Sequence, residues 1–484
     1  MKIAIDLAQL ANQIMQENGL QPNFSTEELQ QLSQITGPAP LSLTTMDLRS
    51  LVWCSIDNDD SRDLDQLTYA EIDGDNKITL WIAIADVDAL VNKDSAIDMH
   101  AQMNTTSVYT PAKIFPMLPE KLSTNLTSLN ENEDRVAIVV KIQINQTGDI
   151  ENSSLFQALV HNYAKLTYNA VGGWLEEKIT LPKEIARVPG LEKTLKIQHQ
   201  AAQILNQKRH EAGALTLESP KAEAKMDSNG QIAIQCSQPN FAQQLIEEFM
   251  VAANSATAAH FSEAKIVSLR RVVRVPKYWN RIVEVAKSFG EDLPAEPDAK
   301  ALDAFLIKRK NTDLASFPDL SLTIIKLLGR GEYVVENNGA SPVGHFALAL
   351  SDYTHFTAPN RRFPDLISQR QYKAFLQGQK NSPYTLEELN SLAKHCTLQE
   401  DAANKVERQL NKSAAAILLS SQIGSVFKGL VTGVGDKGTW VRIFQPAVDG
   451  RIIQGFEKLQ IGDKVSVRLT SVNILKGFID FVIA

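Results

Sequence analysis

The feature that most constrains the fold of this chain is a run of acidic residues directly behind an apolar segment. Residues 52–56, Val-Trp-Cys-Ser-Ile, predict a short buried strand. Five aspartates follow within residues 57–65. Because neighbouring carboxylates repel each other, this segment cannot enter a core unless a cation or another positive group compensates them. The sequence therefore places a strand end at the boundary between core and solvent.

The spacing of these aspartates indicates how they could converge. If residues 63–65 are extended, Asp63 and Asp65 project to the same side, because side-chain direction repeats every two residues. Asp57 returns to that point if residues 58–62 form a loop. Oxygen ligands of this kind suit hard cations such as magnesium. An exposed acidic loop and a calcium loop remain alternatives, although the central glycine and terminal glutamate of an EF-hand are absent.

Composition sets the broad class. The chain has 484 residues, 44% apolar and 22% charged, which predicts a soluble globular protein of about three domains. No apolar run reaches the roughly 18 residues of a membrane span, and Asp6 interrupts any signal peptide. The three cysteines lie far apart and show no metal-ligand spacing. We therefore expect a cytoplasmic protein with no membrane partner.

The net charge of −7 decides little about nucleic-acid binding, because a basic groove can exist on an acidic protein. Local charge is uneven. Residues 424–484 carry eight Lys/Arg and five Asp/Glu, and residues 270–277 are also basic. A solvated face and a nucleic-acid contact are both open interpretations of each segment.

Three segments differ in pattern. Residues 1–48 predict two short helices, the second with a capping box of Ser25 and Glu28. This pair is either a helix-turn-helix-like module or, as we favour, a packing appendage. Residues 49–420 contain a long apolar strand over 78–87, a helix over 241–261 and a helical stretch over 364–420. These patterns predict a mixed α/β (α+β) domain.

The last 61 residues predict a five-stranded OB β-barrel. Glycines punctuate five short strand-like runs, at 426–432, 438–444, 449–454, 464–470 and 477–483. Trp440, Arg442 and Phe444 alternate onto one face, whereas Val441 and Ile443 face the core. We thus predict three domains, spanning 1–48, 49–420 and 424–484.

The acidic stretch 55–66 resembles a signature of the ribonuclease II/R superfamily, whose RNB domain carries four aspartates in this arrangement. Residues 353–366, Tyr-Thr-His-Phe-Thr-Ala-Pro-Asn-Arg-Arg-Phe-Pro-Asp-Leu, resemble its other signature. Shorter matches lie between them in the same order, at 84–87, 117–119, 164–168, 247–250 and 344–346. The likeness covers about residues 50–375, and residues 424–484 resemble the S1-type OB domain that ends many members.

The resemblance implies a processive 3′→5′ exoribonuclease that hydrolyses single-stranded RNA to nucleoside 5′-monophosphates. It implies magnesium as the cofactor, with manganese as a substitute, and no organic cofactor. We expect the chain to act as a monomer. Carried over by position, Asp57 and Asp63 hold metal, and Asp65 is the carboxylate most critical for the chemical step. Two cations about 3.5–4 Å apart can serve such a phosphoryl displacement.

The resemblance also assigns RNA contacts. Arg361 matches an arginine at the scissile phosphate, whose oxygens a planar guanidinium can bind in pairs. Simple ion pairing of Arg361 and Arg362 with Asp365 is the alternative. Tyr109 matches an aromatic that stacks on the 3′-terminal base, and a π-face accepts any base. Glu247 matches a glutamate near the terminal ribose, and its neighbour Glu248 is a candidate for a structural role.

The barrel adds two RNA contacts to this set, Trp440 for stacking and Arg442 for charge. Core packing is the alternative for Trp440.

Three positions depart from the family pattern. Gln66 stands at the fourth aspartate, where it can offer magnesium a neutral carbonyl oxygen, with Asp59 or Asp60 as substitutes for the lost charge. Leu217 aligns with a second base-stacking position that is aromatic in ribonuclease II. Asn360 replaces the usual isoleucine before the arginine. Gln66 keeps a rival hypothesis open, a catalytically weakened RNB-fold protein that binds RNA as a regulator.

Overall fold

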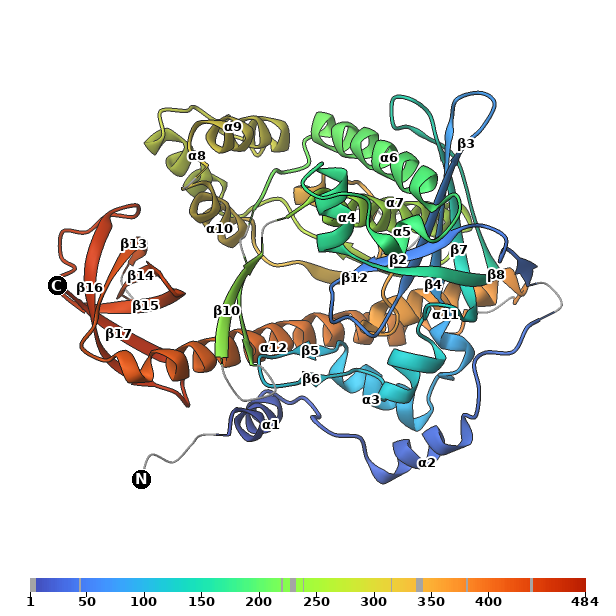
Figure 1. Cartoon of the computed structure of the whole chain (residues 1–484), viewed down its shortest axis with the longest axis horizontal. Helices are drawn as coiled ribbons and strands as arrows, with labels where there is room; N and C mark the ends of the chain where they lie inside the picture. Colours follow the sequence, from blue (N-terminus) through green and yellow to red (C-terminus); the bar gives the residue numbers. More distant parts are fainter. Residues whose placement is uncertain are drawn as a thin grey trace.

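The computed structural model describes residues 6–42, 45–218, 221–226, 232–237, 239–314, 316–336, 343–379, 382–435 and 438–484. Residues 1–5 and 43–44 of the predicted N-terminal module lie outside this range. The described residues form a large α/β body, a long helix and a small barrel at the C-terminal end of that helix (Figure 1). The mixed α/β fold class with a C-terminal barrel is confirmed.

A six-stranded sheet forms the centre of the large body, in the order β1-β8-β2-β3-β4-β7. Its strands are β1 (Met46–Asp47), β2 (Trp53–Asp57), β3 (Gln66–Ile72), β4 (Ile78–Ala85), β7 (Asp134–Ile144) and β8 (Ile150–Thr167). The first part of β8 pairs with β7 and its last part pairs with β2, in parallel. This long strand therefore connects the two ends of the sheet.

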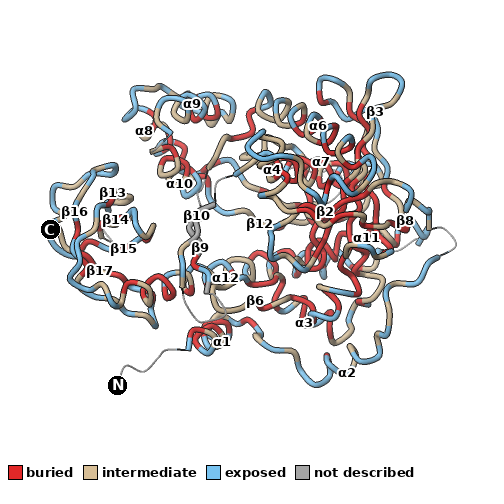
Figure 2. The backbone as a smooth tube through the Cα atoms, in the orientation of Figure 1, coloured by how far each residue is buried: buried red, intermediate tan, exposed pale blue. Residues whose placement is uncertain are grey.

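Both faces of the sheet are buried, which accounts for the nearly continuous apolar run of β4. Along this strand Ile82 and Ile84 belong to one core cluster, whereas Ala83 and Ala85 belong to another. The first cluster is covered by α4 (Tyr168–Leu175), α5 (Lys183–Ala186), α6 (Leu191–Ala212) and α7 (Phe241–Glu263). The second is covered by α3 (Ala96–Asn104), α11 (Phe363–Leu376) and α12 (Leu386–Leu419). Figure 2 shows the buried backbone gathered around this sheet.

The helical stretch predicted over 364–420 is two helices, because the chain turns between α11 and α12. Gly378 adopts a positive φ of 67°, which ends α11, and Thr385 with Glu388 forms a capping box that starts α12. The 34 residues of α12 reach from the sheet to the barrel, where Ala416 and Leu419 join the barrel core. This helix therefore links the two parts of the molecule (Figure 1).

The N-terminal helices are α1 (Leu7–Glu17) and α2 (Thr26–Gln34), and the capping box of Ser25 and Glu28 is present. Helix α1 packs against α12 and against the hairpin of β5 (Val108–Tyr109) and β6 (Ile114–Phe115). The apolar side chains of Leu10 and Ile14 share a buried cluster with Phe115. The predicted helical segment thus lies against the large body of the molecule.

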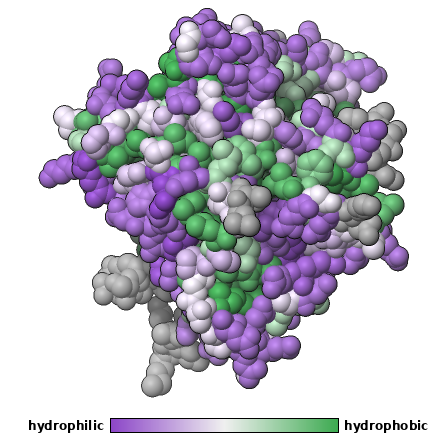
Figure 3. Space-filling model, turned by 90° about the vertical axis from the view of Figure 1, so that its right-hand side faces the viewer, coloured by the Kyte–Doolittle hydropathy of each residue, from purple (hydrophilic) through white to green (hydrophobic). Residues whose placement is uncertain are grey.

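The remaining strands and α-helices lie between the large body and the barrel or at the edge of the large body. They are β9 (Lys221–Met226) paired with β10 (Ile232–Ser237), β11 (Ser268–Val272) paired with β12 (Glu332–Glu336), and the helices α8 (Trp279–Ser288), α9 (Ala299–Thr312) and α10 (Phe317–Leu328). One face of the molecule is mostly hydrophilic, with hydrophobic residues gathered in smaller areas between (Figure 3). That mixture is ordinary for a folded surface. No helix among the described residues is both long and apolar enough to cross a membrane.

The barrel is closed, in the order β13-β14-β15-β17-β16. Its strands are β13 (Val426–Gly435), β14 (Gly438–Phe444), β15 (Ala447–Gln454), β16 (Lys464–Asn473) and β17 (Phe478–Ile483). Val441 and Ile443 are fully buried in its core, whereas Trp440 and Arg442 are half-buried and Phe444 is exposed. The predicted alternation along β14 is therefore present.

Candidate active site

The acidic loop begins at the end of β2, where Asp57 is the last strand residue. Oδ1 of Asp57 accepts hydrogen bonds from the Asn58 N–H at 2.7 Å and the Ser61 hydroxyl at 2.9 Å. Leu64 enters the core beneath the loop, and its N–H donates to Oγ of Ser128 at 3.0 Å. The loop is thus fixed at both ends, as the prediction of a return after Asp57 requires.

Asp65 and Arg361 are distant in the sequence and lie in contact in the fold. Asp65 is 2% exposed, and the Arg361 Nε lies 3.3 Å from its Oδ2. The other carboxylate oxygen, Oδ1, accepts the backbone N–H of Asn360 at 3.0 Å. Arg362, in contrast, pairs with Asp365 at 2.7 Å. The pairing with Asp365 considered for both arginines is therefore present for Arg362, whereas Arg361 pairs with Asp65.

Tyr109 joins the cluster from the β5–β6 hairpin. Its hydroxyl donates to Oδ2 of Asp63 at 3.2 Å, and its backbone N–H donates to Glu407 of α12 at 2.7 Å. The side chain is 39% exposed, so one part of the ring remains accessible. The structure thus brings Asp63, Asp65, Arg361 and Tyr109 into one cluster.

The electrostatics of this cluster show a shortage of positive charge. Burial raises the pKa of Asp65 to about 7, and the nearby Asp63 adds to this rise although Arg361 opposes it. Burial likewise raises the pKa of Asp57, again against the effect of Arg361. Burial, followed by the charge of Asp63, also raises the pKa of the Tyr109 hydroxyl. A bound cation would favour the charged carboxylates in this environment.

The donor set fits a hard cation by its chemistry, because three carboxylates supply oxygen alone. In the part of the chain that is described, however, no group of three or more His, Cys, Asp or Glu side chains is arranged so that it could hold a metal ion. Gln66 is the first residue of β3 and is 8% exposed. Its side chain makes no hydrogen bond to Asp57, Asp63 or Asp65 within the described residues, so its role as a ligand stays a prediction.

The two other acidic residues of the loop point to different partners. Asp59 accepts a hydrogen bond from Asn169 at 2.7 Å, and Asp60 pairs with Lys225 of β9 at 2.8 Å. The Lys225 partner lowers the pKa of Asp60. Substitution of either aspartate for the missing fourth carboxylate would require it to leave these contacts.

Glu247 and Leu217 lie apart from the contacts of the aspartate cluster. The Glu247 side chain is 63% exposed on α7, 3.5 Å from Arg209 Nη2. Its neighbour Glu248 is 1% exposed and accepts bonds from Asn206 and Arg209, which agrees with a structural role. Leu217 packs against the apolar cluster of α8, α9 and α10. Contacts of Glu247 and Leu217 with RNA stay predictions.

The barrel residue Arg442 already has acidic partners. Its Nε and Nη2 donate to Asp449 at 3.0 and 3.2 Å, and its Nη1 pairs with Asp319 of α10 at 3.1 Å. Trp440 stands beside it on the same face of β14, with its backbone paired to Arg451 of β15. Any contact of Arg442 with a phosphate would therefore compete with Asp319.

No role was assigned from the sequence to two residues near the site, Tyr168 and Lys165, although both lie in the matched segment 164–168. Tyr168, the first residue of α4, lies near Asp57; burial and then the charge of that carboxylate raise the pKa of its hydroxyl. The Lys165 ammonium donates to the carbonyl oxygen of Ser61 in the acidic loop. The motif match was the signal for both, but only the fold shows the contacts.

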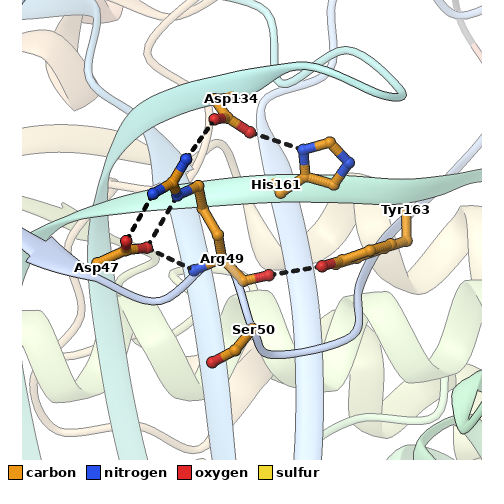
Figure 4. Close-up of a pocket in the computed structure, with 6 residues that line it drawn as sticks. All are labelled: Asp47, Arg49, Ser50, Asp134, His161 and Tyr163. Atoms are coloured by element: carbon orange, nitrogen blue, oxygen red, sulfur yellow. Dashed lines mark hydrogen bonds and ion pairs between the residues drawn. The ribbon is translucent and has the colours of Figure 1, made fainter.

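A separate open pocket of about 520 Å³ lies at the β1–β8 edge of the sheet (Figure 4). Arg49 is at its centre, bound to Asp47 and Asp134, and the Nδ1–H of His161 donates to the Asp134 carboxylate at 2.7 Å. On β8, His161 is six residues before Thr167, which pairs with Asp57, so the pocket is roughly 20 Å from the acidic cluster. None of its lining residues belongs to the predicted site.

Comparison with known proteins places this arrangement in a family. The RNB domain family matches residues 45–378, and the C-terminal S1 domain of RNase II-type exonucleases matches residues 425–484. The chain therefore belongs to the RNB-domain family. Ribonuclease R of Escherichia coli (strain K12) is 31% identical over 470 residues, which cover 90% of this chain and 57% of that protein. The chain thus spans a little more than half the length of the curated relatives it matches.

Solved structures share the fold. Mycoplasma genitalium RNase R in complex with ribose methylated single-stranded RNA aligns with a TM-score of 0.87 and 24% identity, covering 99% of this chain and 78% of that one. Yeast Ssd1, described as a pseudonuclease, aligns with a TM-score of 0.74 and 17% identity, covering 92% and 55%. At these identities the likeness establishes the fold alone. The same fold occurs in proteins described as a nuclease and as a pseudonuclease, so function must be argued from the site.

Proposed function

We propose that this chain is a magnesium-dependent, processive 3′→5′ exoribonuclease that hydrolyses single-stranded RNA to nucleoside 5′-monophosphates. The observation that carries the proposal is the buried Asp65 carboxylate beside the Arg361 guanidinium, with Asp63 and Tyr109 in contact around it. A catalytic site of this kind needs carboxylates for cations and a planar cation for the phosphate. Relatives named Ribonuclease R support the assignment.

Each residue of the cluster has a role in this proposal. Asp57, Asp63 and Asp65 hold magnesium, or manganese in its place, and Gln66 contributes a neutral oxygen. The bound cations supply activation of a water and stabilisation of the leaving oxygen. Arg361 would bind the non-bridging oxygens of the scissile phosphate in place of Asp65, whose carboxylate would hold metal.

The RNA contacts extend from the cluster outward. Tyr109 stacks on the 3′-terminal base, with Leu217 on the other side in place of an aromatic, and Glu247 binds the terminal ribose. Trp440 and Arg442 of the barrel contact the strand further from its 3′ end. Magnesium is the cofactor, single-stranded RNA is the partner, and the chain acts as a cytoplasmic monomer. The proposed units are the helical segment 1–48, the catalytic domain 49–420 and the RNA-binding barrel 424–484.

A second candidate function is that of an RNA-binding regulator with a weakened catalytic site. Gln66 favours it, because one negative charge is missing from the cluster. The likeness to yeast Ssd1 shows that the fold is compatible with it. Against it, a site released from catalysis has little reason to retain Asp65, whose pKa is raised by burial and further by the charge of Asp63, beside two more aspartates. We therefore give precedence to the enzyme.

The test uses the purified chain with 5′-labelled single-stranded RNA, with and without magnesium, and a denaturing gel. We expect loss of full-length RNA to a short labelled remnant only when magnesium is present. Asp65→Asn is the control, since it keeps the size of the side chain and removes its charge; it should stop hydrolysis and leave RNA binding largely intact. Intact RNA with clear binding by the unmodified chain would favour the regulator, and hydrolysis by the Asp65→Asn variant would refute the assigned site.

A further inference from the structure

Asn360 has an unusual environment next to the acidic cluster. Its side chain is fully buried, and its backbone N–H donates to Oδ1 of Asp65 at 3.0 Å. Its side-chain amide meets the Thr127 hydroxyl at 2.6 Å, across 233 positions of the chain. Thr127 is itself 4% exposed. This buried contact therefore joins the loop before α11 to the segment around Thr127, whose next residue, Ser128, is hydrogen-bonded to the acidic loop at Arg62 and Leu64.

The Thr127 hydroxyl has one proton but two neighbouring acceptors, Oδ1 of Asn360 and the carbonyl oxygen of Leu122 at 2.9 Å. If the proton goes to Asn360, the amide nitrogen Nδ2 has no hydrogen-bond partner among the described residues. If the proton goes to Leu122, the amide can turn and donate Nδ2 to Thr127. In both orientations Thr127 is the side chain that holds Asn360.

Two consecutive residues control both oxygens of one carboxylate. The Asn360 N–H binds Oδ1 of Asp65, and the Arg361 Nε lies 3.3 Å from Oδ2. On its other side, this loop is held through its backbone: the Arg361 carbonyl accepts from the N–H of Ser107 and the hydroxyl of Thr106, both at 3.0 Å. The Asp365 side chain binds the same loop at the Ala358 N–H and the Arg362 guanidinium, so the Thr127 contact is the anchor at the Asn360 side chain itself.

We propose that Asn360 is a positioning residue, which through Thr127 sets the orientation of the Asp65 carboxylate and the place of the Arg361 guanidinium. The proposal rests on the proposed exoribonuclease function. An isoleucine, the residue usual in the family, could fill the same space but could not bond to Thr127. A displacement of about 1 Å at reacting groups can lower a rate by about a hundredfold, so a lost anchor should reduce turnover without removing the RNA contacts.

The test measures kcat and KM for single-stranded RNA with Asn360→Ile, Thr127→Val, the double variant and Thr127→Ser. We expect each of the first two to lower kcat by about tenfold or more with KM changed by less than about twofold. The double variant should be no worse than the poorer single variant, because both changes remove one contact. Thr127→Ser keeps the hydroxyl and should retain most of the turnover.

Thr68→Val is the matched control for folding. The Thr68 hydroxyl donates to Gln198 at 2.7 Å in the core between β3 and α6, so its loss removes a similar buried bond away from the site. We expect a lowered Tm with unchanged kcat. Two outcomes would overturn the positioning role. One is an unchanged kcat in Asn360→Ile and Thr127→Val. The other is an additive loss of kcat that only follows the fall in Tm, with a similar loss of kcat in Thr68→Val. If the unmodified chain does not hydrolyse RNA, the proposed function fails, and the positioning role fails with it.

Discussion

The Arg361 guanidinium lies 3.3 Å from the buried Asp65 carboxylate, a contact that joins residues 296 positions apart. Without RNA or metal, each charge compensates the other, since an unpaired buried charge is costly. In the proposed enzyme, this pairing would hold both groups in place before RNA and metal bind. Residues around this pair are therefore the places where substitutions should separate binding from turnover.

Gln66→Asp should increase the affinity of the protein for magnesium. The new carboxylate restores the fourth negative charge beside Asp65, so the magnesium concentration for half-maximal activity should fall by about fivefold. Without metal, the added repulsion should lower the Tm, and magnesium should restore it. Thermal unfolding and RNA hydrolysis over a magnesium titration measure both effects. An unchanged requirement, with Gln66→Asn as the neutral control, would show that position 66 does not face the metal.

Tyr109 should act through its ring and not through its hydroxyl. Tyr109→Ala should weaken binding of short RNA by about 1–3 kcal/mol, the usual contribution of one stacked base. Tyr109→Phe loses only the bond to Asp63 and should stay within about threefold of the unmodified chain. The backbone bond to Glu407 persists in both variants, so the hairpin should remain in place. Binding of a tetranucleotide to metal-free protein distinguishes them; equal effects would argue against stacking.

The stability of the fold should fall in acid through His345. Burial, followed by the charges of Arg271 and Arg209, lowers the pKa of His345 to about 4, and its Nδ1 accepts the N–H of Leu348. The unfolded chain then binds more protons than the folded one between about pH 6.5 and 4. This contribution is complete above pH 6.5 and is lost as the pH falls toward 4.

The measurement is urea unfolding of the unmodified chain and of His345→Asn between pH 7.5 and 4.5. Asparagine keeps an acceptor for the Leu348 N–H and does not titrate. The free energy of unfolding of His345→Asn should therefore fall by about 1–2 kcal/mol less over that range than that of the unmodified chain. The difference between the two proteins is the relevant quantity. Asp65, whose pKa is raised to about 7, acts in the opposite direction in both of them. Parallel pH profiles would contradict the assignment to His345.

The parts of the fold that sequence could predict are those with a local pattern. The alternation of Trp440, Val441 and Arg442 located β14, and Ser25 with Glu28 located the start of α2. The 18-residue β8 is not among the elements that were predicted from the sequence. Its apolar and polar residues follow no single period, because its two parts pair with different strands.

The candidate site, like the fold, could be predicted only in part from the sequence. The aspartates and Arg361 could be singled out because they lie in recognisable motifs, and Tyr109 because of its position in the family pattern. The contact of Thr127 with Asn360 and the position of Tyr168 beside Asp57 depend on the packing of segments that are distant in sequence. No residue pattern in either segment indicates its partner. Asn360 could be noticed as a departure, but its buried bond is visible only in three dimensions.

The last prediction concerns the contact between the barrel and α10. Arg442 is bound by both Asp449 and Asp319, and of these two bonds the second joins the barrel to α10. If phosphates compete with Asp319 for Arg442, Asp319→Asn should tighten binding of RNA long enough to reach the barrel by about two- to fivefold. Arg442→Gln should weaken it, and neither change should alter binding of a tetranucleotide.

Asp149→Asn is the matched control, since it removes the same charge from the surface pair with Lys208 at the far end of β7 and β8. A general gain from lower negative charge would appear equally in this control and would disappear at high salt. Binding of a 25-nucleotide and a 4-nucleotide RNA at two salt concentrations separates these effects. If Asp319→Asn instead weakens binding of the long RNA, the ion pair serves to hold the barrel in position. Trp440 lies on the same strand as Arg442, and it would lose its alignment with the RNA when this pair is removed.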